Sequence, residues 1–159
     1  MSHLWYLKEG RTVQKGKILF ISFEEALNKN LNNYDVKLQI VRYTQQGKLK
    51  DFIHVPQLAP SEQLFNKTMR KWKQLKFTKE EREVIRNGKT KTWFDLYEIE
   101  FIKQMENDKI FKKNYIRLKE LLLQGKNIVA VCYCENYKKC HRYLIAQKLI
   151  NEGFIVEIK

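Results

Sequence analysis

A chain of 159 residues with 43% hydrophobic and 13% aromatic residues is long and apolar enough for a single globular domain, which we place over 1–159 with its core over about 17–158. No segment approaches the ~20 apolar residues of a membrane span and no secretory signal is recognisable, so we expect a soluble, cytoplasmic protein without a membrane partner. The formal net charge of +13 favours a nucleic-acid or nucleotide partner, although a solvated surface and an AT-rich genome would also explain the lysine content.

The first 60 residues contain short apolar runs separated by polar turns. Ser22, followed three residues later by Glu25, forms the capping box that predicts a helix start. Between 34 and 43 apolar residues recur at every second position, which is typical of a strand. In chain order this part is expected to hold a lead-in, a strand, a short helix, a second strand, and a loop or short strand: 1–15, 16–22, 23–31, 34–43 and 52–60.

The middle of the chain is predicted to be helical. Ser61, Thr78 and Asp108 stand where helix N-caps are expected, and Gly125 where a helix ends. The apolar residues recur at helical spacing, and the expected helices are 62–76, 80–87, 92–105 and 108–125. The first of these helices carries a run of cations, here called the basic patch: Lys67, Arg70, Lys71, Lys73 and Lys76.

The end of the chain predicts a βαβ unit. The run "NIVAVCY" at 127–133 is apolar and β-branched, as in a strand buried on both faces. A helix over 141–153 and a strand over 154–158 follow, so the two strands are expected to be parallel, with a right-handed crossover. The fold class is therefore α/β, a three-layer sandwich with a mostly parallel sheet.

All three cysteines lie in one stretch of eleven residues, "CYCENYKKCHR", at 132–142. An odd, clustered count argues against the disulfide framework of a secreted protein. Cys132 lies near the end of the predicted buried strand, and Cys140, His141 and Arg142 open the next helix. Ligands of open α/β sheets bind beyond the carboxyl ends of the strands, and the free N–H groups of a helix start suit an anion. The stretch is therefore the best candidate site, with Arg142 as a fork for phosphate or carboxylate.

Several chemical roles fit these residues. Cys140, at a helix start beside His141 and Arg142, is expected to have a lowered thiol pKa and to act as a nucleophile or redox cysteine. A disulfide between Cys132 and Cys140 is a further interpretation, and Cys132 also fits simple packing within a strand. A zinc site is less favoured, because adjacent Cys140 and His141 diverge on a helix and no second pair of ligands is present. We therefore predict no metal, and the sequence identifies no cofactor.

The Cys-x7-Cys-His-Arg run between a hydrophobic strand and a helix resembles the signature of the DUF488 family, small α/β domains of uncharacterised function. Three upstream segments are similar to further family features: the strand "LQIVRY", the helix entry "QLAPSEQLF" and the helix "FDLYEIEF". The resemblance spans roughly 17–158 and implies that six residues converge on one pocket: Arg42, Ser61, Tyr97, Cys140, His141 and Arg142. Family members often carry Glu two residues after the first cysteine, where this chain has Cys134.

The first function hypothesis is an enzyme that acts on a nucleotide or a nucleic acid. Cys140 would be the nucleophile, or His141 the acid or base. Arg42 and Arg142 would grip phosphate, because a guanidinium forks onto two oxygens.

The alternative is a non-catalytic DNA- or RNA-binding or inhibitor protein, such as an accessory protein of a phage or other mobile element. It would use the basic patch, with Trp72 and Phe77 stacking on bases, although we place Trp72 itself on the apolar helix face. A redox sensor built on the three cysteines is a weaker third hypothesis. The oligomeric state is not predicted.

Overall fold

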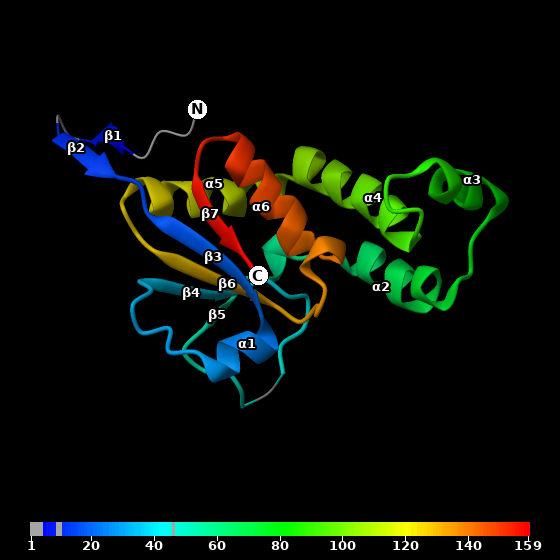
Figure 1. Ribbon diagram of the computed structural model, residues 1–159, viewed down its shortest axis with the longest axis horizontal. Coiled ribbons are helices and arrows are strands. Elements are labelled where there is room, and N and C mark those ends of the chain that lie inside the picture. Colours follow the sequence, from blue (N-terminus) through cyan, green and yellow to red (C-terminus); the bar gives the residue numbers. More distant parts are fainter. Residues whose placement is uncertain (1–4, 9–10, 46) are drawn as a thin grey trace.

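A parallel sheet forms the centre of the molecule (Figure 1). The computed structural model describes residues 5–8, 11–45 and 47–159. Within that part of the chain the main sheet has five strands in the order β5-β4-β6-β3-β7, and all neighbouring strands run parallel. The strands are β3 Lys17–Ser22, β4 Val36–Gln39, β5 Ile53–His54, β6 Ile128–Cys132 and β7 Ile155–Ile158.

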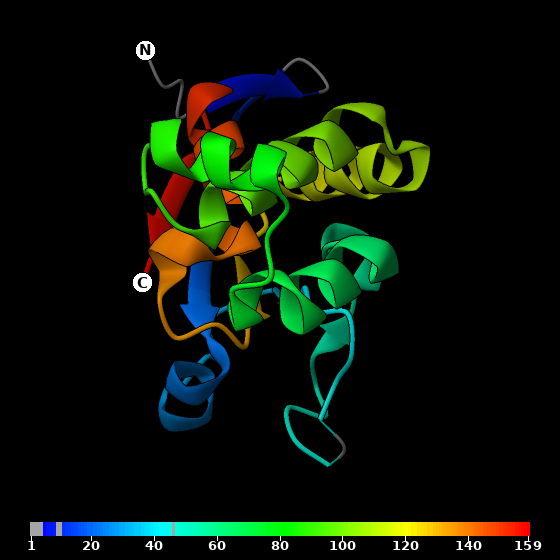
Figure 2. The same cartoon turned by 90° about the vertical axis from the view of Figure 1, so that its right-hand side faces the viewer.

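Helices connect these strands. The α-helices are α1 Phe23–Asn28, α2 Glu62–Arg70, α3 Lys79–Asn87, α4 Trp93–Asn107, α5 Lys109–Leu123 and α6 His141–Asn151. Short 3-10 turns are η1 Pro56–Leu58, η2 Trp72–Gln74 and η3 Tyr137–Lys139. Helices α2, α3 and α4 extend beyond the sheet, to the right in Figure 1 and toward the viewer in Figure 2. Among the described helices, none has the length and hydropathy that crossing a bilayer requires.

Side chains of the central strands alternate between the two faces of the sheet. In β3, Ile18 and Phe20 join the larger hydrophobic cluster, whereas Leu19 and Ile21 join the smaller one. Residues of α2, α4, α5 and α6 complete the larger cluster, and α1 with its flanking loops covers the smaller one. The predicted three-layer α/β fold is therefore confirmed, with most of the helical mass on one face.

The predicted βαβ unit at the end of the chain is confirmed as β6-α6-β7, and its two strands are parallel. They are not neighbours, because β3 lies between them and pairs with both. The loops after β3 and β6 leave toward opposite faces, since α1 covers one face and α6 the other. Such a divergence opens a crevice at the carboxyl ends of the strands.

Element boundaries differ from prediction in several places. The helix expected over 62–76 ends at Arg70, because the chain tightens into η2 and Leu75 takes a left-handed conformation with φ 61°. The tightened turn buries Trp72, whose indole N–H donates to Glu81 at 2.8 Å. The placement of Trp72 on the apolar side is thus confirmed.

The lead-in expected over 1–15 contains a small antiparallel sheet of β1 Trp5–Lys8 and β2 Arg11–Gln14. Residues 1–4 and 9–10 of this segment lie outside the described residues. The helix expected over 23–31 ends at Asn28, and the strand expected over 34–43 is reduced to β4. Beyond β4 the pairing continues for one further backbone hydrogen bond, from Ile40 N–H to Val131 at 3.0 Å.

Candidate functional site

Two cysteines and a histidine meet at the carboxyl end of β6, and we call them the Cys–His cluster: Cys132, Cys140 and His141. Cys132 is the last residue of β6, Cys140 is the N-cap of α6, and His141 is the first residue of α6. The Sγ atoms of Cys132 and Cys140 lie 3.0 Å apart, and each is 3.7 Å from His141 Nδ1. All three side chains are buried, and the cysteines are free thiols.

The backbone at Cys140 explains how adjacent residues face one another. Cys140 is extended, with φ −142° and ψ 149°, whereas His141 already belongs to the helix. The prediction that Cys140 and His141 diverge on a helix is therefore wrong, because only one of them is helical. The argument from divergence against a metal site no longer holds for this cluster.

A backbone carbonyl orients the imidazole of His141. Its Nε2 lies at hydrogen-bond distance from the carbonyl oxygen of Ile40, just beyond β4, and a carbonyl can only accept. Nε2 therefore carries the proton, and the lone pair of Nδ1 points at the two sulfurs. Burial is the main cause that lowers the pKa of His141, which keeps the ring neutral at pH 7.

The three thiols differ in acidity. Burial alone would raise the pKa of Cys132, but its hydrogen bonds with Cys134 and Cys140 and the charge of Arg142 bring that pKa well below its ordinary value. Burial and the neighbouring cysteines raise the pKa of Cys140 well above its ordinary value. The pKa shift at Cys140 is thus opposite in direction to the predicted lowering, and the surroundings of the strand residue Cys132 are those that favour a thiolate.

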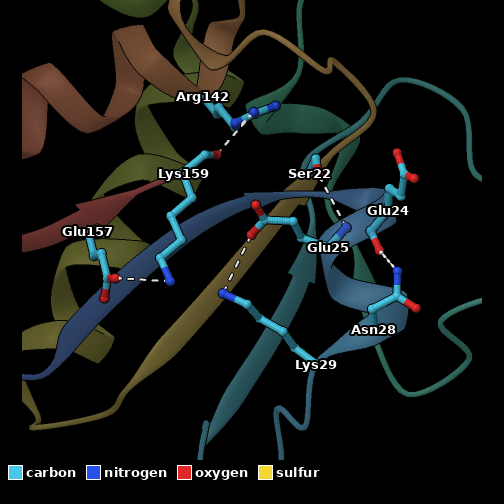
Figure 3. A network of polar contacts seen from close by, with 8 residues as sticks. All are labelled: Ser22, Glu24, Glu25, Asn28, Lys29, Arg142, Glu157 and Lys159. Carbon is cyan, nitrogen blue, oxygen red and sulfur yellow. Dashed lines mark hydrogen bonds and ion pairs between the residues drawn. The ribbon is translucent and has the colours of Figure 1, made fainter.

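Arg142 is completely buried beneath the cluster, at 0% exposure. Its guanidinium donates to the backbone oxygens of Cys134 at 2.6 Å and Lys159 at 3.1 Å, and it lies 3.7 Å from Cys140 Sγ. Figure 3 shows the bond to Lys159. Its Nε has no hydrogen-bond partner among the described residues. Arg142 therefore ties the loop after β6 to the end of β7, rather than presenting a fork to an anion as the sequence suggested.

A cavity of about 330 Å³ lies above the cluster, and we call it the cysteine pocket. Its floor includes all three members of the Cys–His cluster. Five aromatic residues line it: Tyr43, Phe65, Trp93, Tyr97 and Tyr133. Three cations also line it, Arg42, Lys73 and Lys139, and none of its described lining residues is acidic. Such a site suits a flat, apolar ligand that carries negative charge.

The other residues named from the sequence are only partly brought together. Arg42 and Tyr97 line the cysteine pocket with Cys140 and His141, and the Arg42 side chain also donates to the backbone oxygens of Pro56 and Pro60. Burial and the nearby cysteines raise the pKa of the Tyr97 hydroxyl well above its ordinary value. Ser61 lines a neighbouring cavity and caps α2 by accepting the N–H of Leu64.

Gln104 on α4 holds the pocket wall, and sequence reasoning missed it. Its amide donates to the carbonyl of Ala59 at 2.9 Å and accepts the N–H of Ser61 at 2.8 Å, so it fixes the loop on both sides of Pro60. Nothing in the local pattern distinguishes this glutamine from a solvated one. The pocket cation Lys139 was missed as well, and Lys73 was predicted only as a member of the basic patch and not as a pocket residue.

The basic patch is exposed, and it extends from α2 through η2 to the loop before α3. Lys67, Arg70 and Lys71 line the neighbouring cavity, whereas Lys73 lies at the cysteine pocket, 5.0 Å from the centre of the Trp93 ring. Trp72 is buried under Lys67, so it cannot stack on a base. Lys73 is thus the member of the patch that connects it with the pocket.

A comparison with protein families finds a match for most of the chain. Residues 27–153 match a family model described as "DUF488-N3a: Active DUF488-N3 subclade". The matched region contains the whole Cys–His cluster and every described residue that lines the cysteine pocket. No curated protein and no solved structure matches the chain.

Proposed function

Because the chain belongs to the DUF488-N3a family, whose model is described as an active subclade, we propose that it is an enzyme acting on a nucleotide, either free or within a nucleic acid. The reaction takes place in the cysteine pocket. The reactive groups are those of the Cys–His cluster at its floor, including Cys140 and His141.

The make-up of the pocket wall carries this proposal. A nucleobase is flat and stacks on aromatic rings, and five such rings surround the cavity. A phosphate is anionic, and the cations Arg42, Lys73 and Lys139 meet no described carboxylate in the lining that would compete for them. A cavity of about 330 Å³ is at the small end of ligand pockets, which fits one nucleotide rather than a longer segment.

A nucleic-acid substrate would approach across the basic patch. The patch adjoins the pocket at Lys73, so a strand held by its phosphates on α2 could deliver one nucleotide to the cavity. The non-catalytic alternative uses the same patch without the pocket. Since Trp72 is buried, that alternative loses one of the two aromatic residues that it named for stacking on bases, and half-buried Phe77 is the other.

Binding of nucleoside monophosphates tests the substrate class. We expect the fluorescence of Trp93 to change on binding, and the double substitution Lys73→Ala with Lys139→Ala to weaken affinity by about tenfold or more, since two charge-assisted contacts are lost. The matched control is Arg70→Ala with Lys71→Ala, which removes the same charge outside the pocket and should leave the affinity of a free nucleotide unchanged. Equal effects of the two pairs would contradict specific binding in the pocket.

Chromatographic analysis of nucleotides and oligonucleotides after incubation tests catalysis. Cys140→Ser is expected to abolish product formation while nucleotide affinity stays within about threefold, because the change replaces one sulfur and leaves the walls intact. Full turnover by this variant would exclude Cys140 from the reaction. Failure of every nucleotide to bind the wild-type protein would refute the substrate class.

A further inference from the structure

We propose that Cys132, Cys140 and His141 bind a Zn²⁺ ion whose fourth coordination position opens into the cysteine pocket. The inference deepens the proposed function, from which it takes only the pocket as the place of reaction. It can be tested without knowledge of the substrate, because metal binding and nucleotide binding are separate measurements.

The ligand atoms already converge. In a tetrahedral site with Zn–S of about 2.3 Å and Zn–N of about 2.0 Å, neighbouring ligand atoms lie about 3.5–3.8 Å apart. His141 Nδ1 is 3.7 Å from each sulfur, which falls in this range. The two Sγ atoms are 3.0 Å apart, so binding of an ion would increase the distance between them by about 0.8 Å. Small rotations of the two cysteine side chains are enough for this change.

The histidine is in the form that a metal requires. Its Nε2–H is committed to the carbonyl of Ile40, so the Nδ1 lone pair faces the sulfurs. A hydrogen bond of this kind, from the far ring nitrogen to a backbone carbonyl, is what holds zinc-binding imidazoles in place. Thiolate and imidazole together select zinc over harder ions such as magnesium. On binding, each protonated thiol releases its proton to solvent, and the neutral imidazole releases none.

The position of Arg142 favours a negatively charged group at the fourth coordination position of the proposed zinc ion. Its guanidinium is buried 3.7 Å from Cys140 Sγ, and its other hydrogen-bond partners in the described part of the chain are backbone oxygens. A buried cation requires a nearby anion. Zn²⁺ with two thiolates is neutral overall, so a hydroxide or an anionic substrate group at the fourth position would add a negative charge close to this guanidinium. A zinc-bound hydroxide is a nucleophile at neutral pH, which suits hydrolysis or deamination of a nucleotide.

A disulfide is the competing use of the same cysteines. It would require an S–S distance of about 2.05 Å and would employ two residues of the cluster. It would leave unexplained why the Nδ1 lone pair of His141 is aimed at both sulfurs. Cys134, whose Sγ is 3.8 Å from that of Cys132, is half-buried and lies outside the cluster, which makes it the internal control.

The experiment is a titration of the reduced, chelator-treated full chain with Zn²⁺ against a chromophoric chelator. We expect one Zn²⁺ per chain, and an affinity reduced about 100-fold or more in Cys132→Ser and in Cys140→Ser. Cys134→Ser should lose less than about tenfold. Absence of stoichiometric binding to the wild type would overturn the site, and an equal loss in Cys134→Ser would overturn the open fourth position.

A second measurement uses the wild type alone, in case the buried variants fail to fold. X-ray absorption of the zinc-loaded protein should give two sulfur ligands, with nitrogen or oxygen for the rest. Three or more sulfurs, or none, would overturn the proposed ligand set. If zinc binds as expected but no nucleotide does, the metal site stands and the proposed substrate class fails. If a nucleotide binds but zinc does not, the substrate class stands and the metal site fails.

Discussion

At the scale of single residues, backbone contacts decide which side chains are available for chemistry. Arg142 and His141 were both named from the sequence as site residues, yet their roles differ. The guanidinium of Arg142 donates two hydrogen bonds to backbone oxygens. In His141, by contrast, only Nε2 bonds to the backbone, and Nδ1 faces the cysteines. A short motif identifies residues that lie together, but the partners of each side chain decide which of them can meet a ligand.

Arg142→Ala is expected to lower the free energy of unfolding by about 3 kcal/mol or more, because it leaves a cavity in place of a fully buried side chain and removes the donor from two part-buried backbone oxygens. Denaturant unfolding measures the change. Arg86→Ala removes an exposed arginine paired with Glu83 and should cost within about 0.5 kcal/mol. If Arg142→Ala were as stable as wild type but bound nucleotide poorly, Arg142 would be an anion ligand after all.

At the scale of elements, capping residues fix where a helix begins and can also tie that helix to the buried core. Thr78 and Glu81 form a reciprocal capping box at the start of α3, and Glu81 also accepts the indole N–H of Trp72. One carboxylate thus joins the start of α3 to the buried end of η2. Burial alone would raise the pKa of Glu81, but these hydrogen bonds and the charge of Lys67 outweigh it, and the pKa is lowered.

This lowered pKa predicts an acid-dependent loss of stability. Because the pKa of Glu81 is lower in the folded than in the unfolded chain, its contribution is complete above the unfolded pKa and is lost as pH falls through the folded pKa. Below about pH 4, the denaturant midpoint of Glu81→Gln should therefore fall less with decreasing pH than that of the wild type. Glu83→Gln on the same helix is the control, and an identical pH profile for both variants would contradict the role of Glu81.

At the scale of the whole molecule, the net charge of +13 predicts salt-dependent association with nucleic acid. The affinity of a single-stranded oligonucleotide should fall steeply with salt. Arg70→Ala with Lys71→Ala should reduce the slope of log affinity against log salt by about 1.4, at ~0.7 per phosphate contact. Lys17→Ala with Lys126→Ala, at the amino ends of β3 and β6, should leave the slope nearly unchanged. If the two double variants had the same slope of log affinity against log salt, the net charge rather than the basic patch would govern binding.

Most elements could be predicted from the sequence because periodicity reports local burial. The stripe Phe111, Tyr115, Leu118 and Leu122 is buried in α5 as its spacing requires, and β6 is buried along its whole length. Helix ends were predicted less well. The apolar periodicity continues to residue 76, but α2 ends at Arg70 because the chain tightens there to bury Trp72. For the site, the motif located Cys132, Cys140 and His141. The lowered thiol pKa, however, was predicted for Cys140, whereas the surroundings of Cys132 are those that lower it.

By itself, the sequence determined the fold class, the order of the elements, the family resemblance and the stretch that holds the reactive groups, because each depends on residues close together in the chain. Only the tertiary structure decided the strand order with β3 between β6 and β7, the burial of Arg142, and the position of Lys73 and Lys139 at the cysteine pocket. These features arise from contacts between residues far apart in sequence, such as His141 with Ile40. Local spacing carries no information about such pairs, because their geometry is set by how strands and helices pack.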